Sequence, residues 1–272
     1  MKDSMKNKVI VITGASDGIG AELARQLAPL GAKLVLAARS TDKLHAVAAE
    51  CQALGAQTAV VQCDVTLKDD CTRLTTEAVA AFGGIDILVN NAGVSMHGWF
   101  ADTPDTVVYE KLFAVNVMGT INCTHAAMPY LKASRGMIVG LASLAGKFGV
   151  PARTAYCMTK FAMNGFFEAL RIELVRDGVA VCMIQPGVVA TNIRRNGWNA
   201  LGEVAGSSGL SEKNAMPLDV CVNEIVDAMQ TRKREVIMSG RGKLAVLMRV
   251  LWPAFVDNLA LKALSKVGQR KS

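Results

Sequence analysis

An α/β chain built around a doubly wound parallel sheet is predicted from three features of the 272-residue sequence. Short runs rich in Val, Ile and Leu alternate with longer helical patterns from one end to the other, as strands joined by crossover helices do. These runs show little polar alternation, which is typical of strands buried on both faces. Hydrophobic residues make up 51% of the chain, enough for a large core. We expect one domain of about seven strands with helices on both faces.

The predicted strands and helices follow one another in regular order. The strands, in chain order, are expected at residues 9–13, 33–38, 58–62, 85–90, 137–141, 179–185 and 235–238. The intervening segments that are long enough for crossover helices include residues 19–30, 41–54, 68–82 and 154–176. This order predicts right-handed crossovers that place helices on both sides of the sheet.

A glycine-rich turn follows the first predicted strand and precedes the first helix. Glycines there allow a tight turn and let main-chain N–H groups approach a pyrophosphate at the helix N-terminus. The spacing is GxxxGxG and not GxGxxG, so the position in the fold carries the prediction. We expect a Rossmann-like dinucleotide site that includes Gly14, Ser16, Asp17, Gly18, Ile19 and Gly20.

The end of the second predicted strand indicates which dinucleotide binds. An NAD site usually has a carboxylate there for the ribose 2′-hydroxyl. Here Arg39 and Ser40 follow Ala38 instead, and an arginine can chelate the 2′-phosphate of NADP. We therefore predict NADP(H) as the cofactor. Arg39 as a solvated residue at a helix start is the alternative, and Asp17 opposes a 2′-phosphate if its carboxylate faces that pocket.

Polar residues also follow the third and fourth predicted strands, where ligands of doubly wound sheets bind. Asp64 and Val65 follow the third strand, and Asp64 could accept a hydrogen bond from the adenine amino group. The fourth strand ends in Asn90, which could contact the ligand or could equally tie neighbouring strands together. The cofactor contacts predicted after that strand are Asn91, Ala92 and Gly93.

Taken together, these segments and three later ones resemble the short-chain dehydrogenase/reductase family over residues 8–238. The motifs TGxxxGxG, NNAG, Ser, YxxxK and PG occur in the family's order. The chain length is similar to that of the single-domain, NADP-preferring members. The resemblance implies a homodimer or homotetramer. It also implies catalysis by Asn116, Ser143, Tyr156 and Lys160, and further cofactor contacts from Tyr156, Lys160, Pro186, Gly187, Val189 and Thr191.

The proposed chemistry depends on a tyrosine and a lysine four residues apart on one helix face. A nearby ammonium at Lys160 would lower the pKa of the Tyr156 phenol. Ser143 could donate to the substrate oxygen as charge grows there. We predict hydride transfer between nicotinamide and a carbonyl or alcohol, with Tyr156 moving the proton. Asn116 would hold a water near the lysine, as the resemblance implies, or it satisfies a main-chain carbonyl.

The substrate and the competing functions follow from the remaining segments. Residues 94–99 and 144–150 are mostly apolar, so a hydrophobic carbonyl or alcohol substrate is expected. The alternatives are a 3-oxoacyl-carrier-protein reductase and a non-catalytic NADP-binding regulator, although the Ser–Tyr–Lys set of such a regulator would be broken. His97 could contact the substrate, but a surface-loop position is favoured. Arg194 and Arg195 in the lid could meet an acidic carrier or a phosphate, but solvated loop charges are favoured.

Two segments extend the expected domain organisation. Residues 1–241 would form the cofactor-binding and catalytic domain, with a substrate lid near 188–217. Residues 242–272 are expected to form an amphipathic C-terminal extension, with positive charge from Lys243, Arg249, Lys262 and Lys266. This extension could lie on a membrane surface. Packing over the pocket or on another subunit is favoured, because amphipathic helices mostly bury against protein.

Composition excludes several other classes of protein. The formal net charge is +7, without the basic clusters or motifs of a nucleic-acid-binding protein, so no nucleic-acid partner is predicted. The seven cysteines lack CxxC spacing and only three histidines are present, so no metal site is expected. The short polar N-terminus does not resemble a signal peptide. We expect a cytoplasmic protein with reduced cysteines, in peripheral contact with membrane at most.

Overall fold

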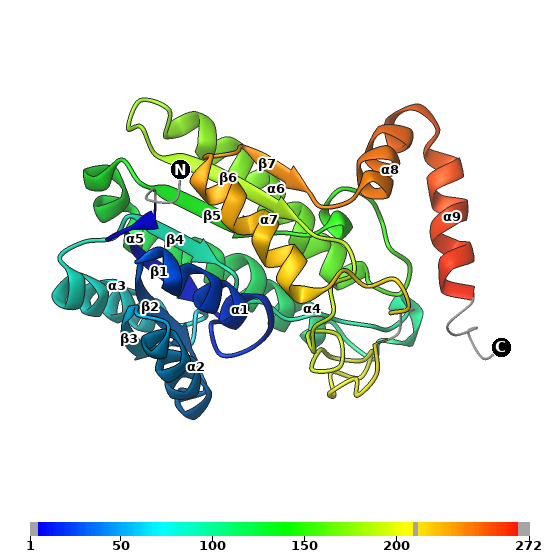
Figure 1. Ribbon diagram of the computed structural model, residues 1–272. Coiled ribbons are helices and arrows are strands. Elements are labelled where there is room, and N and C mark those ends of the chain that lie inside the picture. The colour runs from blue at the N-terminus through cyan, green and yellow to red at the C-terminus, as the bar shows by residue number, and fades with distance from the viewer. Residues whose placement is uncertain (1–4, 209–211, 266–272) are drawn as a thin grey trace.

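The computed structural model describes residues 5–208 and 212–265. Its centre is a seven-stranded parallel sheet in the order β3-β2-β1-β4-β5-β6-β7 (Figure 1). The order changes direction between β1 and β4, which is where doubly wound sheets open a crevice for ligands. The predicted fold class is confirmed. The strands are β1 (Val9–Thr13), β2 (Lys33–Ala38), β3 (Gln57–Gln62), β4 (Ile87–Asn90), β5 (Met137–Leu141), β6 (Ala180–Gln185) and β7 (Glu235–Ile237).

Helices cover both faces of the sheet. Those with their residue bounds are α1 (Gly18–Leu27), α2 (Thr41–Ala53), α3 (Lys68–Phe82), α4 (Val107–Phe113), α5 (Gly119–Ser134), α6 (Thr154–Glu173), α7 (Leu218–Gln230), α8 (Gly240–Leu251) and α9 (Pro253–Ser265). Short turns of other helix types are η2 (Ala28–Leu30), η3 (Phe100–Asp102), η4 (Ala114–Met118) and η5 (Leu144–Gly146). One core layer packs α1, α2 and α7 on the sheet, and the other packs α3, α5 and α6.

Element boundaries differ from the sequence predictions by a few residues, for local reasons. The first helix stops at Leu27 because Pro29 lacks an N–H, and the chain continues as a tighter turn. The fourth strand begins at Ile87 and not at Ile85. Just before it, the carboxylate of Asp86 accepts from the main-chain N–H of Val9 at 2.9 Å. A side chain thus holds the start of β4 against β1.

The cysteines are distributed through both core layers. All seven are free and buried. Cys51 lies on the buried face of α2, and the Sγ atoms of Cys71 and Cys123 are 3.5 Å apart between α3 and α5. Burial raises the pKa of the Cys51 thiol to about 11 and that of the Cys182 thiol to about 12. The thiols therefore behave as small core residues.

The C-terminal extension departs from the main body of the protein. It forms two helices, α8 and α9, which meet at Trp252 and Pro253, and α9 lies at the periphery (Figure 1). Residues 266–272 of the predicted extension lie outside the described residues. Several large apolar side chains on both helices are exposed, Val250 among them at 79%. Within the described residues, none of the helices has the length and hydropathy needed to span a membrane.

Candidate active site

The glycine-rich turn between β1 and α1 has a backbone that other residues would not tolerate. Gly14 and Gly18 have φ values of 66° and 56°, in the left-handed region. A Cβ on Gly20 would lie 2.4 Å from the carbonyl oxygen of Gly14 and 2.5 Å from Nδ2 of Asn91. Asp17 caps α1, with its Oδ1 accepting from the N–H of Gly18 at 2.7 Å. The turn therefore brings bare backbone to the helix N-terminus, where a pyrophosphate is favoured.

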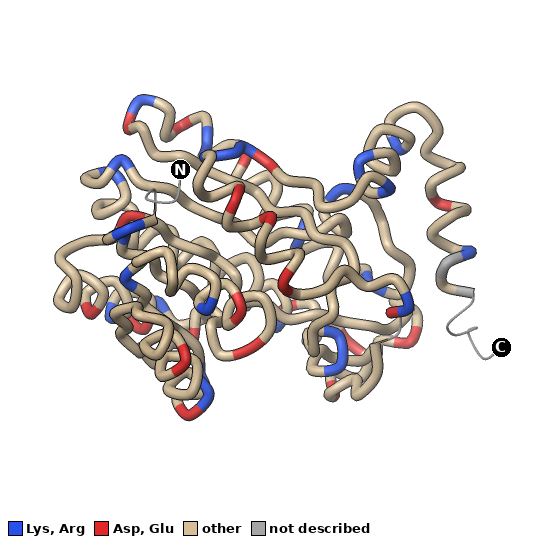
Figure 2. Tube along the Cα trace, viewed as in Figure 1, with Lys and Arg blue, Asp and Glu red and all other residues tan. Residues whose placement is uncertain are grey.

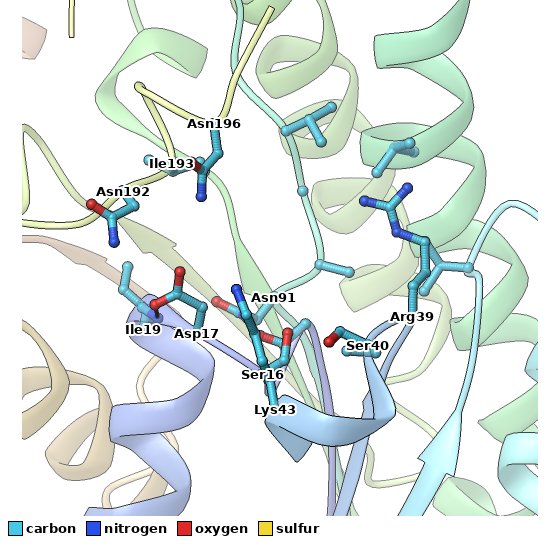
Figure 3. Close-up of a pocket in the computed structure, with 18 of the residues that line it drawn as sticks. Ser16, Asp17, Ile19, Arg39, Ser40, Lys43, Asn91, Asn192, Ile193 and Asn196 are labelled. Carbon is cyan, nitrogen blue, oxygen red and sulfur yellow. Dashed lines mark hydrogen bonds between the residues drawn. The ribbon is translucent and has the colours of Figure 1, made fainter. Parts of the chain in front are cut away.

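A cavity of about 390 Å³ opens above this turn (Figure 3). Most of its lining comes from the carboxyl ends of β1, β2, β3 and β4 with the segments that follow them, and from the loop after β6. Gly20 is outside its lining and packs beneath the turn. The lining includes the predicted cofactor residues Gly14, Ser16, Asp17, Gly18, Ile19, Arg39, Ser40, Asp64, Val65, Asn91, Ala92, Gly93 and Thr191.

One end of this cavity gathers the groups that would meet a 2′-phosphate. Ser16, Ser40 and Lys43 lie between Arg39 on one side and Asp17 on the other (Figure 3). The carboxylate of Asp17 is thus away from Arg39. Lys43 was missed by the sequence analysis. Its signal was a cation in the first turn of a helix, a position where the helix dipole disfavours positive charge unless an anion binds.

Two asparagines at the end of β4 connect the sheet to its surroundings. Nδ2 of Asn91 donates to the carbonyls of Thr13 at 2.9 Å and Gly14 at 3.0 Å. Nδ2 of Asn90 donates to Oγ1 of Thr124 at 3.0 Å. Asn90 therefore ties β4 to α5 and not to a neighbouring strand, and Asn91 makes the contacts between the ends of β4 and β1. Asp64 uses Oδ1 to accept from the N–H of Thr66 at 3.0 Å, which fixes the turn after β3.

A second cavity, of about 900 Å³, adjoins the first. Five residues line both: Ile19, Asn91, Gly93, Thr191 and Ile193. Ser143, Tyr156 and Lys160 line the second cavity, together with Pro186, Gly187 and Val189. Most of the remaining lining is apolar. The fold thus places three of the four predicted catalytic side chains where a cofactor extending from the first cavity would end, whereas Asn116 is outside this lining.

Lys160 is held inside the protein with 4% of its surface exposed. Its Nζ donates to the carbonyl oxygen of Leu141 at 2.7 Å and lies 5.7 Å from the ring centroid of Tyr156. Burial lowers the pKa of Lys160 from 10.5 to about 7. The ammonium therefore loses its proton much more readily than an ordinary lysine, because burial penalises the charged form.

Tyr156 is half-buried at the start of α6. Burial raises the pKa of its phenol above the ordinary value. The positive charge of Arg153 is the largest opposing effect, and the contact with Ser143 also lowers the pKa. The expected lowering of this pKa by Lys160 is therefore wrong for this protein: the net shift is upward, and the main opposing charge is Arg153, one helical turn before Tyr156.

Ser143 stands at the end of β5 in an extended conformation and caps η5. Its Oγ accepts from the N–H of Ala145 at 3.2 Å and lies 3.3 Å from the carbonyl oxygen of Pro186, to which it donates. These contacts fix the hydroxyl beside Tyr156 at the cavity wall. To bind a substrate oxygen, the Ser143 hydroxyl would have to redirect the hydrogen bond that it now donates to the carbonyl of Pro186.

Asn116 lies in η4, a π-helical turn between α4 and α5. Its Oδ1 accepts from the N–H of Val94 at 2.8 Å, and its Nδ2 donates to the carbonyl of Val94 and to Oγ1 of Thr159, each at 3.0 Å. The contacts with Val94 are those expected if Asn116 satisfies main-chain groups, which was the alternative to holding a water near Lys160. The π-turn explains why such a residue interrupts an apolar helix, since π-turns often mark functional sites.

The family and its relatives agree with this geometry. The family model described as short chain dehydrogenase matches residues 8–201. A dehydrogenase/reductase SDR family protein 7-like from Dictyostelium discoideum is 34% identical over 268 residues, covering 96% of this chain and 83% of the relative. The chain belongs to the short-chain dehydrogenase/reductase family. The predicted family membership is confirmed.

Two solved structures resemble this short-chain dehydrogenase/reductase. An alcohol dehydrogenase from Thermococcus sibiricus, complexed with 5-hydroxy-NADP, aligns with a TM-score of 0.74 and 26% identity, covering 85% of this chain and 95% of the other. A metagenomic short-chain oxidoreductase in complex with NADP aligns with a TM-score of 0.70 and 32% identity, covering 86% and 98%.

One expectation about the loop residues of this short-chain dehydrogenase/reductase is corrected by the structure. Arg194 is not solvated but buried, and its guanidinium lies 2.8 Å from Oε1 of Glu212. Its neighbour Arg195 is 60% exposed, as expected. His97 lies in a loop and is half-buried, with its Nδ1 buried without a hydrogen-bond partner among the described residues. Burial lowers the pKa of His97, so its ring is neutral near pH 7.

Proposed function

We propose that this chain is an NADP(H)-dependent oxidoreductase that interconverts a hydrophobic carbonyl compound and its alcohol. One observation carries the proposal. Ser143, Tyr156 and Lys160 share the wall of a largely apolar cavity that joins the cavity above the glycine turn. Such a junction brings a nicotinamide ring and a hydrophobic substrate together beside a proton donor.

The residues of the chain would divide the chemistry among them. The bound dinucleotide supplies the hydride chemistry. Tyr156 gives its proton to the substrate oxygen in reduction and takes one in oxidation. Ser143 donates a hydrogen bond to the same oxygen, which stabilises the charge growing there. Lys160, already buried beneath Tyr156, would hold the ribose hydroxyls and favour the phenolate when it is protonated.

The phenol of Tyr156 gives the direct test. A Tyr156→Phe variant should lose about a hundredfold to ten-thousandfold in turnover while binding NADPH normally, because general acid catalysis contributes effects of that size. NADPH consumption with a panel of ketones, quinones, aldehydes, steroids and acyl thioesters measures this. Tyr130→Phe on α5 is the matched control. Near-normal turnover by Tyr156→Phe contradicts the assigned role.

We propose NADP(H) and not NAD(H) for two reasons. Arg39 and Lys43 line the first cavity, and β2 ends without a carboxylate. The two similar solved structures are complexes with 5-hydroxy-NADP and NADP. Fluorescence titration with both reduced cofactors should show tighter binding of NADPH. Equal or tighter binding of NADH contradicts the preference.

The same panel separates the competing functions. A 3-oxoacyl-carrier-protein reductase would be saturated by acetoacetyl-carrier substrates and would ignore steroid or retinoid ketones. A non-catalytic NADP-binding regulator would bind the cofactor and turn over nothing. The presence of the complete Ser–Tyr–Lys set in one cavity favours an enzyme over that regulator.

A lid over both cavities is part of the proposed enzyme. Within residues 188–217, Thr191 and Ile193 line both cavities, and the described part of the segment excludes residues 209–211. Backbone bridges join Val189 to Met216 and Trp198 to Met96. The first bridge joins the two ends of the lid to each other, and the second ties the middle of the lid to the loop after β4.

We also propose that α8 and α9 rest on an acidic membrane surface. Leu247 and Val250 on α8 and Phe255 on α9 expose 58%, 79% and 51% of their surface. Arg241, Lys243 and Arg249 place positive charge on α8 without an acidic residue in that helix (Figure 2). Apolar side chains with cations suit an anionic bilayer. Ala260 and Leu264 of α9 also line the substrate cavity, so the helices partly cover it.

A vesicle flotation assay tests this contact. A Val250→Glu variant should lose most of its association with vesicles containing phosphatidylserine. The control is Ile172→Glu on α6, where an apolar side chain is 72% exposed on another part of the body. Retained flotation by Val250→Glu, or a loss of dimers instead of vesicle binding, contradicts the membrane contact.

A further inference from the structure

The substrate cavity has an unbalanced charge. Its wall contains Arg153, Lys160, Arg194 and Arg241. Within the described residues, the wall contains neither aspartate nor glutamate. A mostly apolar cavity that concentrates positive charge attracts an anion, because charges in a low-dielectric environment are little screened.

Two of these cations are accounted for by other partners. Lys160 donates to Leu141 and belongs to the catalytic set. Arg194 has a carboxylate partner, Glu212, whose Oε1 lies 2.8 Å from it. Arg241 is exposed at the start of α8. Arg153 remains, a deeply buried guanidinium beside Tyr156.

Arg153 is held firmly but its charge is not neutralised. It is 4% exposed, with one terminal nitrogen donating to Oγ of Ser95 and the other to the carbonyl of Ser208, each at 2.9 Å. Both partners are neutral. Its Nε has no partner, and no ion pair found among residues 5–208 and 212–265 includes Arg153.

Burying such a guanidinium without a counter-ion destabilises the folded protein. A buried charge without a counter-ion costs several kcal/mol, so buried arginines are normally paired. Arginine has five N–H donors in a planar fork, and the two bonds to Ser95 and Ser208 leave three of them free. That fork matches a carboxylate or a phosphate in two-point contact.

We propose that Arg153 receives an anionic group, a carboxylate or a phosphate, on the substrate of the reductase. This inference rests on the proposed function and narrows its substrate class to an amphipathic carbonyl compound. The apolar wall holds the body of the substrate, Tyr156 meets its carbonyl oxygen, and Arg153 meets its acidic group. Because Ser95 and Ser208 orient the guanidinium from opposite segments, the receptor is formed before the substrate enters.

A competing role for Arg153 acts on Tyr156. Its charge favours the phenolate, which lowers the pKa of Tyr156. That role would affect every substrate equally, whereas a receptor distinguishes anionic substrates from neutral ones. The ratio between matched anionic and neutral ligands therefore isolates the receptor.

Three aromatic ketones provide the matched ligands: para-acetylbenzoate, its neutral methyl ester, and para-acetylphenyl phosphate. Their affinity for the wild-type enzyme loaded with NADP is measured by calorimetry, which needs no turnover. At least one anion should bind about tenfold or more tightly than the ester, as hydrogen bonds to a charged group imply. The anion that binds distinguishes a carboxylate from a phosphate receptor.

The variant Arg153→Met should remove this preference, bringing the ratio of anion to ester affinity close to one. Arg153→Lys should retain part of it, because the charge persists without the fork. Arg195→Met in the exposed lid is the control and should keep the full preference. Equal affinity of the wild type for ester and anions, or an unchanged ratio in Arg153→Met, overturns the proposal.

The result is separable from the fate of the proposed function. NADPH oxidation with neutral ketones and no anion preference leaves the reductase intact and removes the receptor. Anion binding that depends on Arg153, without turnover of any ketone in the panel, removes the reductase and keeps the anion site. Melting temperatures of each variant show that the comparison is made between folded proteins.

Discussion

The cofactor cavity and the substrate cavity are built in opposite ways. The first is drawn from consecutive turns at the ends of β1 to β4, and its main features are bare backbone and short polar side chains. The second collects residues from β5, α6, the lid and the two C-terminal helices, most of them apolar. The first therefore depends on a few exact backbone positions, and the second on the sum of many contacts.

This difference teaches where single substitutions matter. A backbone cradle fails when one added atom meets another backbone atom. An apolar wall loses only a small share of its contacts with each truncated side chain. Substitutions in the glycine turn should therefore have larger effects than substitutions in the apolar wall.

Gly20→Val should abolish most cofactor binding. The new Cβ would meet the Gly14 carbonyl at 2.4 Å, so the turn has to shift. We expect NADPH affinity to fall by at least about a hundredfold, as measured by fluorescence titration. Gly84→Val is the control, because a Cβ there meets nothing within 4 Å. If Gly20→Val binds NADPH as the wild type does, the contrast between the cavities collapses.

Arg39→Ala should reduce the preference for NADPH over NADH. Removing one charge-assisted contact to a 2′-phosphate costs NADPH about tenfold to a hundredfold in affinity, with NADH unaffected. Lys43→Ala should have a smaller effect, because an ammonium lacks the two-point geometry of a guanidinium. Parallel titrations with NADPH and NADH measure both. Equal losses for the two cofactors would show that Arg39 does not read the phosphate.

Lys160→Met should stabilise the cofactor-free protein while ending catalysis. The folded state lowers the pKa of this lysine from 10.5 to about 7, so the unfolded chain binds more protons between those values. Stability therefore rises as pH increases from about 7 towards 10.5, and the cost is fully present below pH 7.

The variant removes that cost. We expect about 1–3 kcal/mol of added unfolding free energy near pH 6, with the gain shrinking at alkaline pH. Denaturant titrations at several pH values measure it. Lys262→Met, on the exposed face of α9, serves as a comparison. A loss of stability at every pH would mean that the bond from Lys160 to Leu141 outweighs the burial of charge.

Val220→Ala should have the smallest effect. Val220 lines the substrate cavity and is 42% exposed, so its truncation removes little buried surface. We expect KM for a hydrophobic ketone to rise about twofold to fivefold with kcat unchanged. Initial-rate kinetics measure this. A change as large as that of Gly20→Val would mean that the apolar wall is as exacting as the glycine turn.

The same contrast explains what the sequence could predict. The order of strands, the glycine turn and residues such as Arg39 were predictable, because each depends on neighbours within a short segment. Tyr156 and Lys160 share a helix face for the same reason. Boundaries such as the start of β4 were not predictable to the residue, since the Asp86 carboxylate replaces a strand contact there.

For the substrate cavity, only the mostly apolar lining was predictable, and not the full set of residues that form it. Arg153, Arg194 and Leu264 meet there from segments that no local pattern connects. The burial of Arg194 depends on Glu212, eighteen positions away across the lid. The two alternatives for Asn116 could not be separated either, because its partners Val94 and Thr159 come from other parts of the chain.

The reactivity of the buried cysteines can report how often the folded protein opens. Thiols such as Cys51 and Cys182 are shielded and slow to ionise, so a water-soluble maleimide can react only after the surrounding layer separates. Labelling rates would therefore report the frequency of such separation without any added probe. Adding NADPH should slow the labelling in proportion to its occupancy, since a ligand that binds only the closed form makes opening rarer.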